Sequence, residues 1–171
     1  MNIRTETPND YKEVFHLNYL AFENREDESK LIERIRESED FIPELTLVAE
    51  DHGEIVGHIM FSNAKIINGH EETEVIALGP VAVSPDCQKK GIGGLLIKEG
   101  LRRSKEMGFR LVFLIGHPTY YPRFGFKPAG HFGFQLKQFQ VPEDVFMVYE
   151  LLDGELERVS GELRYSNTFL G

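Results

Sequence analysis

Two segments near the N-terminus carry apolar side chains at the spacing of an amphipathic helix. One begins at Pro8, a residue that favours the first turn of a helix, and continues to Ala21. The other covers Glu28–Ser38, where aliphatic residues share one face and charged residues occupy the opposite face. Residues 2–6 are predicted to form a short strand before the two helices. The chain is therefore predicted to open with one strand and two helices.

Strand-like segments follow, interrupted twice by turn residues. Leu45–Glu50 and Ile55–Ile67 are separated by residues 51–54, which include an Asp and a Gly typical of hairpin turns. Asn68-Gly69 is the same kind of signal before the next segment, Glu74–Val83. This pattern predicts three antiparallel strands joined in a meander.

The clearest helix of the chain is Gly91–Met107. Its apolar residues follow helical spacing, Lys and Arg gather toward its end, and Gly108 stands where helices commonly terminate. The next segment, Leu111–Ile115, is entirely apolar and predicts a strand. Because a helix connects this strand to Glu74–Val83, we expect the two strands to be parallel neighbours.

The remaining segments complete the predicted fold. Phe132–Gln140 and Asp144–Leu152 are expected to close the sheet, and Val159–Phe169 has a strand-like composition without an assigned place. The order of elements predicts an α/β protein of the α+β type, with a mixed, mostly antiparallel central sheet flanked by helices. The chain has 171 residues, no low-complexity linker and no internal repeat. We therefore treat residues 1–171 as a single domain.

Composition narrows the classes of partner. The chain has 19 Lys and Arg against 28 Asp and Glu, a net charge of −9 that opposes binding to nucleic acid or to an anionic membrane. It shows no signal-peptide pattern and no apolar run long enough to span a bilayer. The single cysteine, Cys87, and the absence of a Cys/His cluster at ligand spacing argue against a disulfide or a metal site. We expect a cytoplasmic protein without a metal.

Leu78–Gly94 has the composition of an anion-binding strand, loop and helix. Its glycines allow the backbone to approach a ligand, and the free N–H groups of a first helical turn point outward. Two known phosphate-binding motifs do not match the spacing of residues in this segment. The P-loop requires Gly-Lys-Ser/Thr, which does not occur here, and the dinucleotide fingerprint has Leu96 where its last Gly belongs.

A third motif fits. Gln88-Lys89-Lys90-Gly91-Ile92-Gly93 resembles the Gln/Arg-x-x-Gly-x-Gly/Ala motif of the GNAT superfamily of acyl-CoA N-acyltransferases. Further features stand in the family's order: the strand end Val81–Val83, the Pro85 turn, the long helix, the strand Leu111–Ile115 and the stretch Tyr121–Phe126. The resemblance covers about residues 2–152, and residues 153–171 form an extension of unassigned role. Within the family, the chain resembles a bacterial branch of predicted N-acetyltransferases. It implies a GNAT-like fold.

The resemblance implies a binding site for acetyl-CoA. In the family, backbone amides of the motif hold the coenzyme A pyrophosphate. The strand before the motif splays from its parallel neighbour, and the pantetheine arm enters the gap. Such an edge exposes the unpaired backbone groups that the pantetheine amides require. The cofactor-binding residues implied are Val81, Ala82, Val83, Gln88, Lys89, Lys90, Gly91, Ile92, Gly93 and Gly94.

The resemblance also implies a general acid. Tyr121 lies four residues before the Gly of Gly125-Phe126, as the family's tyrosine does, and Tyr120 is the alternative if the short segment is rotated. Proton transfer from a phenol with a pKa of about 10 to a thiolate with a pKa of about 8.5 is unfavourable by roughly 2 kcal/mol. Candidates for the base are Glu74, on the strand leading to the cofactor, His117, just after the parallel strand, and an ordered water relay.

Together these features predict an N-acetyltransferase that moves an acetyl group from acetyl-CoA to a primary amine by direct attack in a ternary complex. The alternative is a non-catalytic acyl-CoA-binding or protein-interaction module on the same fold. We expect a small-molecule or peptide amine as acceptor, and the acidic excess of the chain favours a cationic one. A homodimer formed through the late strands is an option that the sequence leaves open.

Overall fold

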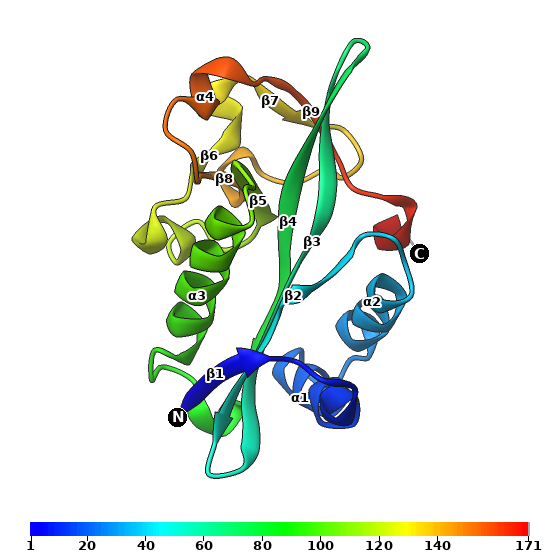
Figure 1. Cartoon of the computed structure of the whole chain (residues 1–171), viewed down its shortest axis with the longest axis vertical. Coiled ribbons are helices and arrows are strands. Elements are labelled where there is room, and N and C mark those ends of the chain that lie inside the picture. The colour runs from blue at the N-terminus through cyan, green and yellow to red at the C-terminus, as the bar shows by residue number, and fades with distance from the viewer. Residues whose placement is uncertain (171) are drawn as a thin grey trace.

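A mixed sheet of nine strands, formed within residues 1–170, runs through the molecule, and helices cover both of its faces (Figure 1). The computed structural model describes residues 1–170. The strands are β1 (Asn2–Thr5), β2 (Phe41–Asp51), β3 (Glu54–Asn68), β4 (Glu71–Val83), β5 (Leu111–Ile115), β6 (Lys127–Pro128), β7 (Phe134–Leu136), β8 (Phe146–Glu150) and β9 (Gly161–Arg164). The α-helices are α1 (Tyr11–Ala21), α2 (Asp27–Arg36), α3 (Ile92–Glu106) and α4 (Glu155–Arg158).

The main path of the sheet follows the order β1-β2-β3-β4-β5-β8-β6. β2, β3 and β4 form the predicted antiparallel meander. The crossover through α3 makes β4 and β5 parallel, as the order of elements predicted. The observed sheet is therefore mixed and mostly antiparallel.

Glycine residues define both ends of α3. Gly91 precedes the helix with φ of +83°, and Gly108 follows it with φ of +90°. The N–H of Phe109 donates to the carbonyl of Ser104 at 3.1 Å, and the N–H of Gly108 donates to that of Lys105 at 3.0 Å. This pair of bonds satisfies two of the last carbonyls of the helix. The predicted end of the helix at Gly108 is confirmed.

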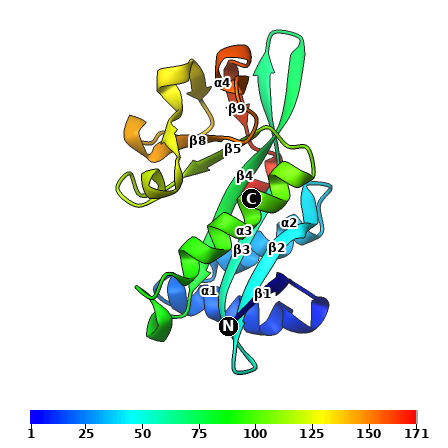
Figure 2. The same cartoon turned by 60° about the vertical axis from the view of Figure 1, so that its left-hand side comes forward.

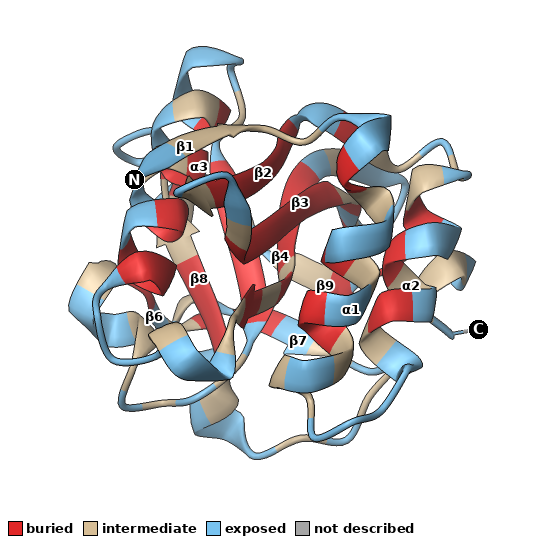
Figure 3. Ribbon diagram, turned by 90° about the horizontal axis from the view of Figure 1, so that it is seen from below, coloured by how far each residue is buried: buried red, intermediate tan, exposed pale blue. Residues whose placement is uncertain are grey.

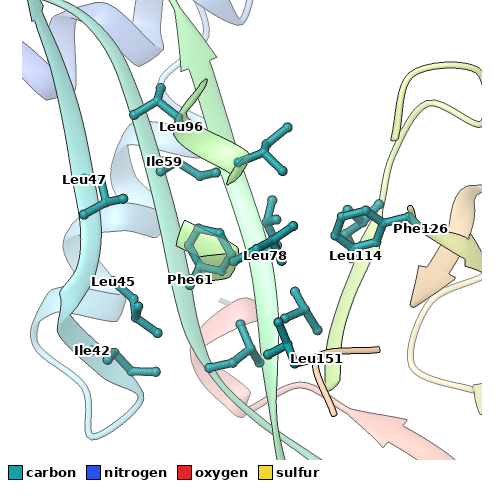
Figure 4. Close-up of a cluster of buried hydrophobic side chains, with 14 of the residues drawn as sticks. Ile42, Leu45, Leu47, Ile59, Phe61, Leu78, Leu96, Leu114, Phe126 and Leu151 are labelled. Atoms are coloured by element: carbon teal, nitrogen blue, oxygen red, sulfur yellow. The ribbon is translucent and has the colours of Figure 1, made fainter. Parts of the chain in front are cut away.

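The face of the sheet that α3 covers holds the larger hydrophobic cluster (Figure 4). Figure 2 shows α3 running across this face. The helix comes close because Gly100 has no side chain: a Cβ atom there would lie 2.0 Å from Cε1 of Phe61. Phe61 is fully buried beneath it. The close packing of α3 on the sheet fixes the position of its N-terminal turn relative to β4.

The opposite face is covered by α1 and α2 at one end and by aromatic side chains at the other. Ile32 and Ile35 of α2 pack with Met60 of β3. Further along, the ring of Phe113 meets those of Phe134 and Phe146 at centroid distances of 4.9 and 6.0 Å. In Figure 3 the buried residues follow the strands and the inner faces of these helices. The two faces of the sheet thus carry separate cores.

The last third of the chain differs from the prediction in detail. Of Phe132–Gln140 only β7 is a strand, and β7 pairs with β9 instead of joining the main path. β9 also pairs with β3, at Lys65–Ile67. The segment after residue 152 therefore contributes to the same sheet. No helix within residues 1–170 is both long and apolar enough to cross a membrane.

Candidate active site

β4 and β5 form a fork. They are paired in register at only two positions, Ile76 with Val112 and Ala77 with Phe113. Beyond them β4 continues to Val83, hydrogen-bonded to β3, whereas β5 continues to Ile115, bonded to β8. The two strands separate in Figure 2. The inner edge of β4 along Leu78–Val83, about 20 Å of extended chain, is therefore open to an added strand-like ligand.

A bulge lies at the start of the open edge. Gly79 and Pro80 together stand opposite the single residue Met60 of β3, because the register shifts between Ile59 and Phe61. Gly79 has φ of +139°, which residues with a side chain rarely adopt, and Pro80 has no N–H to donate. The bulge changes the direction of β4 where the fork opens.

The open edge leads directly into the N-terminal turn of α3. The loop from Ser84 to Gly91 includes a short 3₁₀ turn, Pro85–Cys87, and a left-handed residue, Lys89, with φ of +66°. The first intrahelical bond runs from the N–H of Leu95 to the carbonyl of Gly91. The N–H groups of residues 92–94 precede it, so they have no intrahelical acceptor.

The surroundings of this turn suit an anion. The first turn of α3 contains no acidic residue, and Lys89 and Lys90 are exposed beside it. The Nε2 of Gln88 donates to the carbonyl of Val83 at 3.3 Å, which ties the loop to the end of β4. The structure thus brings the implied cofactor-binding residues, Val81–Val83 and Gln88–Gly94, into one continuous surface. Free amides and positive charge at a helix N-terminus bind phosphate groups.

Tyr121 stands at the β5 side of the fork. It begins a short 3₁₀ helix, η3 (Tyr121–Phe124), and its ring packs so closely on Gly116 that a Cβ there would lie 2.4 Å from Cε2. Burial raises the pKa of Tyr121 to about 12, and the neighbouring Tyr120 acts in the same direction. This pKa is about 3.5 above that of an ordinary thiolate, so proton transfer from Tyr121 to the thiolate costs about 5 kcal/mol. Tyr121 can donate its proton efficiently only to a thiolate that is itself desolvated.

The two candidate bases lie in different surroundings. Glu74 is exposed on β4 opposite Lys65, two residues before the first position paired with β5. It faces a separate cavity of about 690 Å³ beside β9, so the structure does not bring it to the fork. His117 follows β5 and is exposed, and its carbonyl accepts the N–H of Tyr120 at 3.2 Å. Its role as a base stays a prediction.

Tyr120 is the residue whose position the sequence left undecided. Its hydroxyl lies over Gly93, because a Cβ atom on Gly93 would stand 2.8 Å from that oxygen. The ring of Phe124 covers Gly94 in the same way, at 3.0 Å. The two motif glycines therefore make room for η3 as well as for a ligand. No local signal in the sequence pairs these glycines with these aromatic residues, because their contact depends on the tertiary fold.

His58, on β3 opposite Ala82, is fully buried. Its Nε2 lies 3.4 Å from Oε1 of Glu6, which also pairs with Arg36. His58 is therefore a buried histidine of the sheet that contacts Glu6 rather than the fork. Cys87, the only cysteine, is a partly buried free thiol packed against the α3-side core.

Comparison with known proteins identifies the family. A family model described as an acetyltransferase (GNAT) domain matches residues 2–129. The uncharacterized N-acetyltransferase YhbS of Escherichia coli is 32% identical over 170 residues, which cover 99% of this chain and 98% of YhbS. The uncharacterized N-acetyltransferase YjhQ of the same species is 39% identical over 118 residues, 68% of this chain and 65% of YjhQ.

Solved structures agree with these matches. The crystal structure of Escherichia coli YhbS in complex with CoA has a TM-score of 0.91 at 30% identity and covers 99% of this chain and 92% of that one. A GNAT family acetyltransferase from Brucella melitensis in complex with acetyl-CoA has a TM-score of 0.79 at 31% identity, over 98% and 97% of the two chains. With this fold, a fork between β4 and β5 and a glycine-rich helix start, the chain belongs to the GNAT family of N-acetyltransferases.

Proposed function

We propose that the protein transfers an acetyl group from acetyl-CoA to a primary amine by direct attack within a ternary complex. The observation that carries the proposal is the fork, where β4 and β5 pair at two positions and then diverge toward the N-terminus of α3. Two relatives about 30% identical hold CoA and acetyl-CoA in their crystal structures. The same arrangement of strand edge and helix start in this chain fits such a ligand.

The residues of the fork fit both halves of the ligand. The open edge of β4 supplies backbone donors and acceptors to the amides of pantetheine, while Val81 and Val83 anchor the strand by packing on the core beneath α3. The free N–H groups at residues 92–94 and the exposed Lys89 and Lys90 receive the pyrophosphate. When bound, acetyl-CoA supplies a thioester, an activated acyl group with a thiolate leaving group.

The chain has to lower three barriers. A lysine-like amine, with a pKa of about 10.4, costs roughly 4.6 kcal/mol to deprotonate at pH 7, and a base or a water relay offsets this cost. A backbone N–H of the strand around Val81 stabilises the negative charge on the carbonyl oxygen, a contact worth about 10²–10³ in rate. Tyr121, whose ring packs on Gly116 directly after β5, donates the proton that the leaving thiolate accepts.

Two measurements test the proposal. Calorimetry determines whether the protein binds acetyl-CoA, and release of free thiol across a panel of amines determines whether it turns over. Tyr121→Phe keeps the ring that packs on Gly116 and removes only the hydroxyl. We expect acetyl-CoA affinity to stay unchanged and kcat to fall by about 10²-fold or more.

Each other result selects a different function. Turnover that is unchanged in Tyr121→Phe removes this residue from the mechanism. Binding of acetyl-CoA by the wild type without turnover of any amine supports a non-catalytic acyl-CoA-binding module. If calorimetry and thermal shift detect no binding, a protein-interaction role replaces both ligand-based functions.

A further inference from the structure

The side chain of Tyr120 reaches from the end of β5 to the N-terminal turn of α3. A Cβ on Gly93 would lie 2.8 Å from the Tyr120 hydroxyl oxygen and 3.7 Å from Cγ2 of Val83. The hydroxyl, the second residue of α3 and the last residue of β4 therefore meet at one point. This point is the outer end of the fork, where the strand edge passes into the helix start.

Packing holds Tyr120 in this position. Its N–H donates to the carbonyl of His117 at 3.2 Å, and its carbonyl accepts the N–H of Arg123 at 3.2 Å. Its ring meets those of Tyr121 and Phe124 edge to face, at centroid distances of 5.1 and 5.2 Å. Backbone and ring are both fixed, so the hydroxyl is directed to Gly93 by the fold.

The hydroxyl is a proton donor at neutral pH. Burial raises the pKa of Tyr120 above its ordinary value, and the charge of Arg123 acts in the opposite direction. The neighbouring N–H groups of residues 92–94 have no intrahelical acceptor. One site therefore presents the hydroxyl donor of Tyr120, the residue before η3, beside backbone donors from α3, and an oxyanion can accept hydrogen bonds from both.

We propose that Tyr120 is a coenzyme A-binding residue: its hydroxyl donates a hydrogen bond to the pyrophosphate at the start of α3, and Tyr121 alone protonates the thiolate. The inference rests on the proposed function. It assigns binding of the pyrophosphate and donation of the proton to two adjacent tyrosines. The hydroxyl of Tyr120 lies over Gly93, the second residue of α3, whereas the ring of Tyr121 packs on Gly116, directly after β5. The two phenols are therefore placed for different parts of the ligand.

The contact itself can be tested without a ligand. Gly93→Ala places a methyl group 2.8 Å from the Tyr120 oxygen, but in Tyr120→Phe the nearest ring atom, Cζ, is 4.0 Å away, an ordinary contact. We expect Gly93→Ala alone to lower the thermal midpoint by about 3 °C or more, and the Gly93→Ala/Tyr120→Phe double variant to be at least as stable as Tyr120→Phe. Equal losses in both backgrounds would show that the two residues do not touch.

The ligand contact is tested by comparing CoA with pantetheine, which lacks the pyrophosphate. We expect Tyr120→Phe to weaken CoA binding in calorimetry by about tenfold or more, because the lost bond is to a charged group, and to leave inhibition by pantetheine unchanged. Tyr121→Phe should lower kcat and leave the Kd of CoA unchanged. Tyr19→Phe, on α1, is the matched control for removal of a tyrosine hydroxyl.

The outcomes separate this inference from the proposed function. If the wild type does not bind CoA or acetyl-CoA, the proposed function fails first. If the wild type binds and Tyr120→Phe binds equally well, or loses pantetheine as much as CoA, the pyrophosphate contact is refuted. If Tyr120→Phe abolishes turnover at an unchanged Kd, Tyr120 is the acid and the division between the two tyrosines is reversed.

Discussion

Among single residues, the motif at Gln88–Gly94 combines backbone N–H donors with two exposed positive charges. Lys89 and Lys90 are exposed next to the first turn of α3, so we expect them to contribute to CoA binding by a salt-dependent electrostatic attraction. We expect Lys90→Ala to weaken CoA binding about two- to fivefold at low ionic strength, with the difference shrinking in 0.5 M NaCl. Calorimetry at the two salt concentrations measures both effects.

Lys89 needs a different substitution, because its φ of +66° strains an alanine. Lys89→Gly removes the charge at a backbone conformation that glycine adopts freely, so the same salt-dependent loss is expected. Lys98→Ala, exposed further along α3, serves as the control for a lysine away from the turn. A loss of affinity that persists undiminished at high salt would mean that the loop conformation, and not the charge, had changed.

Among the elements, a partly buried ion pair joins β1 to the start of α1. Arg4 donates two hydrogen bonds to the carboxylate of Asp10, at 2.8 and 2.9 Å, and the N–H of Thr7 adds a third at 2.8 Å. The bonds from Arg4, opposed by burial and helped by Thr7, lower the pKa of Asp10 to about 2. The ionised form of Asp10 therefore stabilises the folded state.

The sign of the pH dependence follows from this depressed pKa. Asp10 contributes its full stabilisation above its ordinary pKa near 3.8, and the contribution, about 2 kcal/mol, disappears as the pH falls to about 2. We expect Asp10→Asn to lower the free energy of unfolding by about 2 kcal/mol at pH 7, and to show a smaller further loss between pH 4 and pH 2 than the wild type. Urea denaturation across that pH range measures the difference.

The control for Asp10→Asn is Asp153→Asn, an exposed carboxyl. Other carboxylates also contribute to the loss of wild-type stability at low pH. Glu6 is one of them: burial raises its pKa, but His58 and Arg36 lower it by more, so the net pKa is below the ordinary value. Asp10→Asn should therefore reduce the acid-induced loss without abolishing it. Parallel stability curves for Asp10→Asn and the wild type from pH 4 to pH 2 would contradict the assignment.

The sequence was most informative where structure is local. The motif at Gln88–Gly94 and the end of α3 at Gly108 were predictable because glycine positions and free amides are set by neighbouring residues. The strands β7 and β9 were not, because three or four residues carry too little periodicity and their pairing depends on distant partners. The choice between Tyr120 and Tyr121 likewise depends on how η3 packs over α3.

In the whole molecule, the two lysines beside the first turn of α3, Lys89 and Lys90, belong to a chain of net charge −9. The 28 Asp and Glu outnumber the 19 Lys and Arg. The cavity of about 690 Å³ beside β9 is lined by four acidic residues, Glu39, Asp40, Glu72 and Glu74, and by the basic residues Lys65 and Arg164. A field of this sign attracts cations and repels anions at low salt. We therefore expect the acidic excess to influence the choice of acceptor, since the anionic ligand is proposed to bind at the first turn of α3.

Three amines of similar length test this effect on acceptor choice. 1,4-Diaminobutane, 1-aminobutane and 4-aminobutanoate present the same primary amine with an added positive, neutral or negative end. We expect kcat/KM to fall in that order, by several-fold at each step at low ionic strength, and the differences to narrow in 0.5 M NaCl because the Debye length shortens to a few ångström. A higher kcat/KM for 4-aminobutanoate would show that a local cationic contact, and not the net field of the molecule, selects the acceptor.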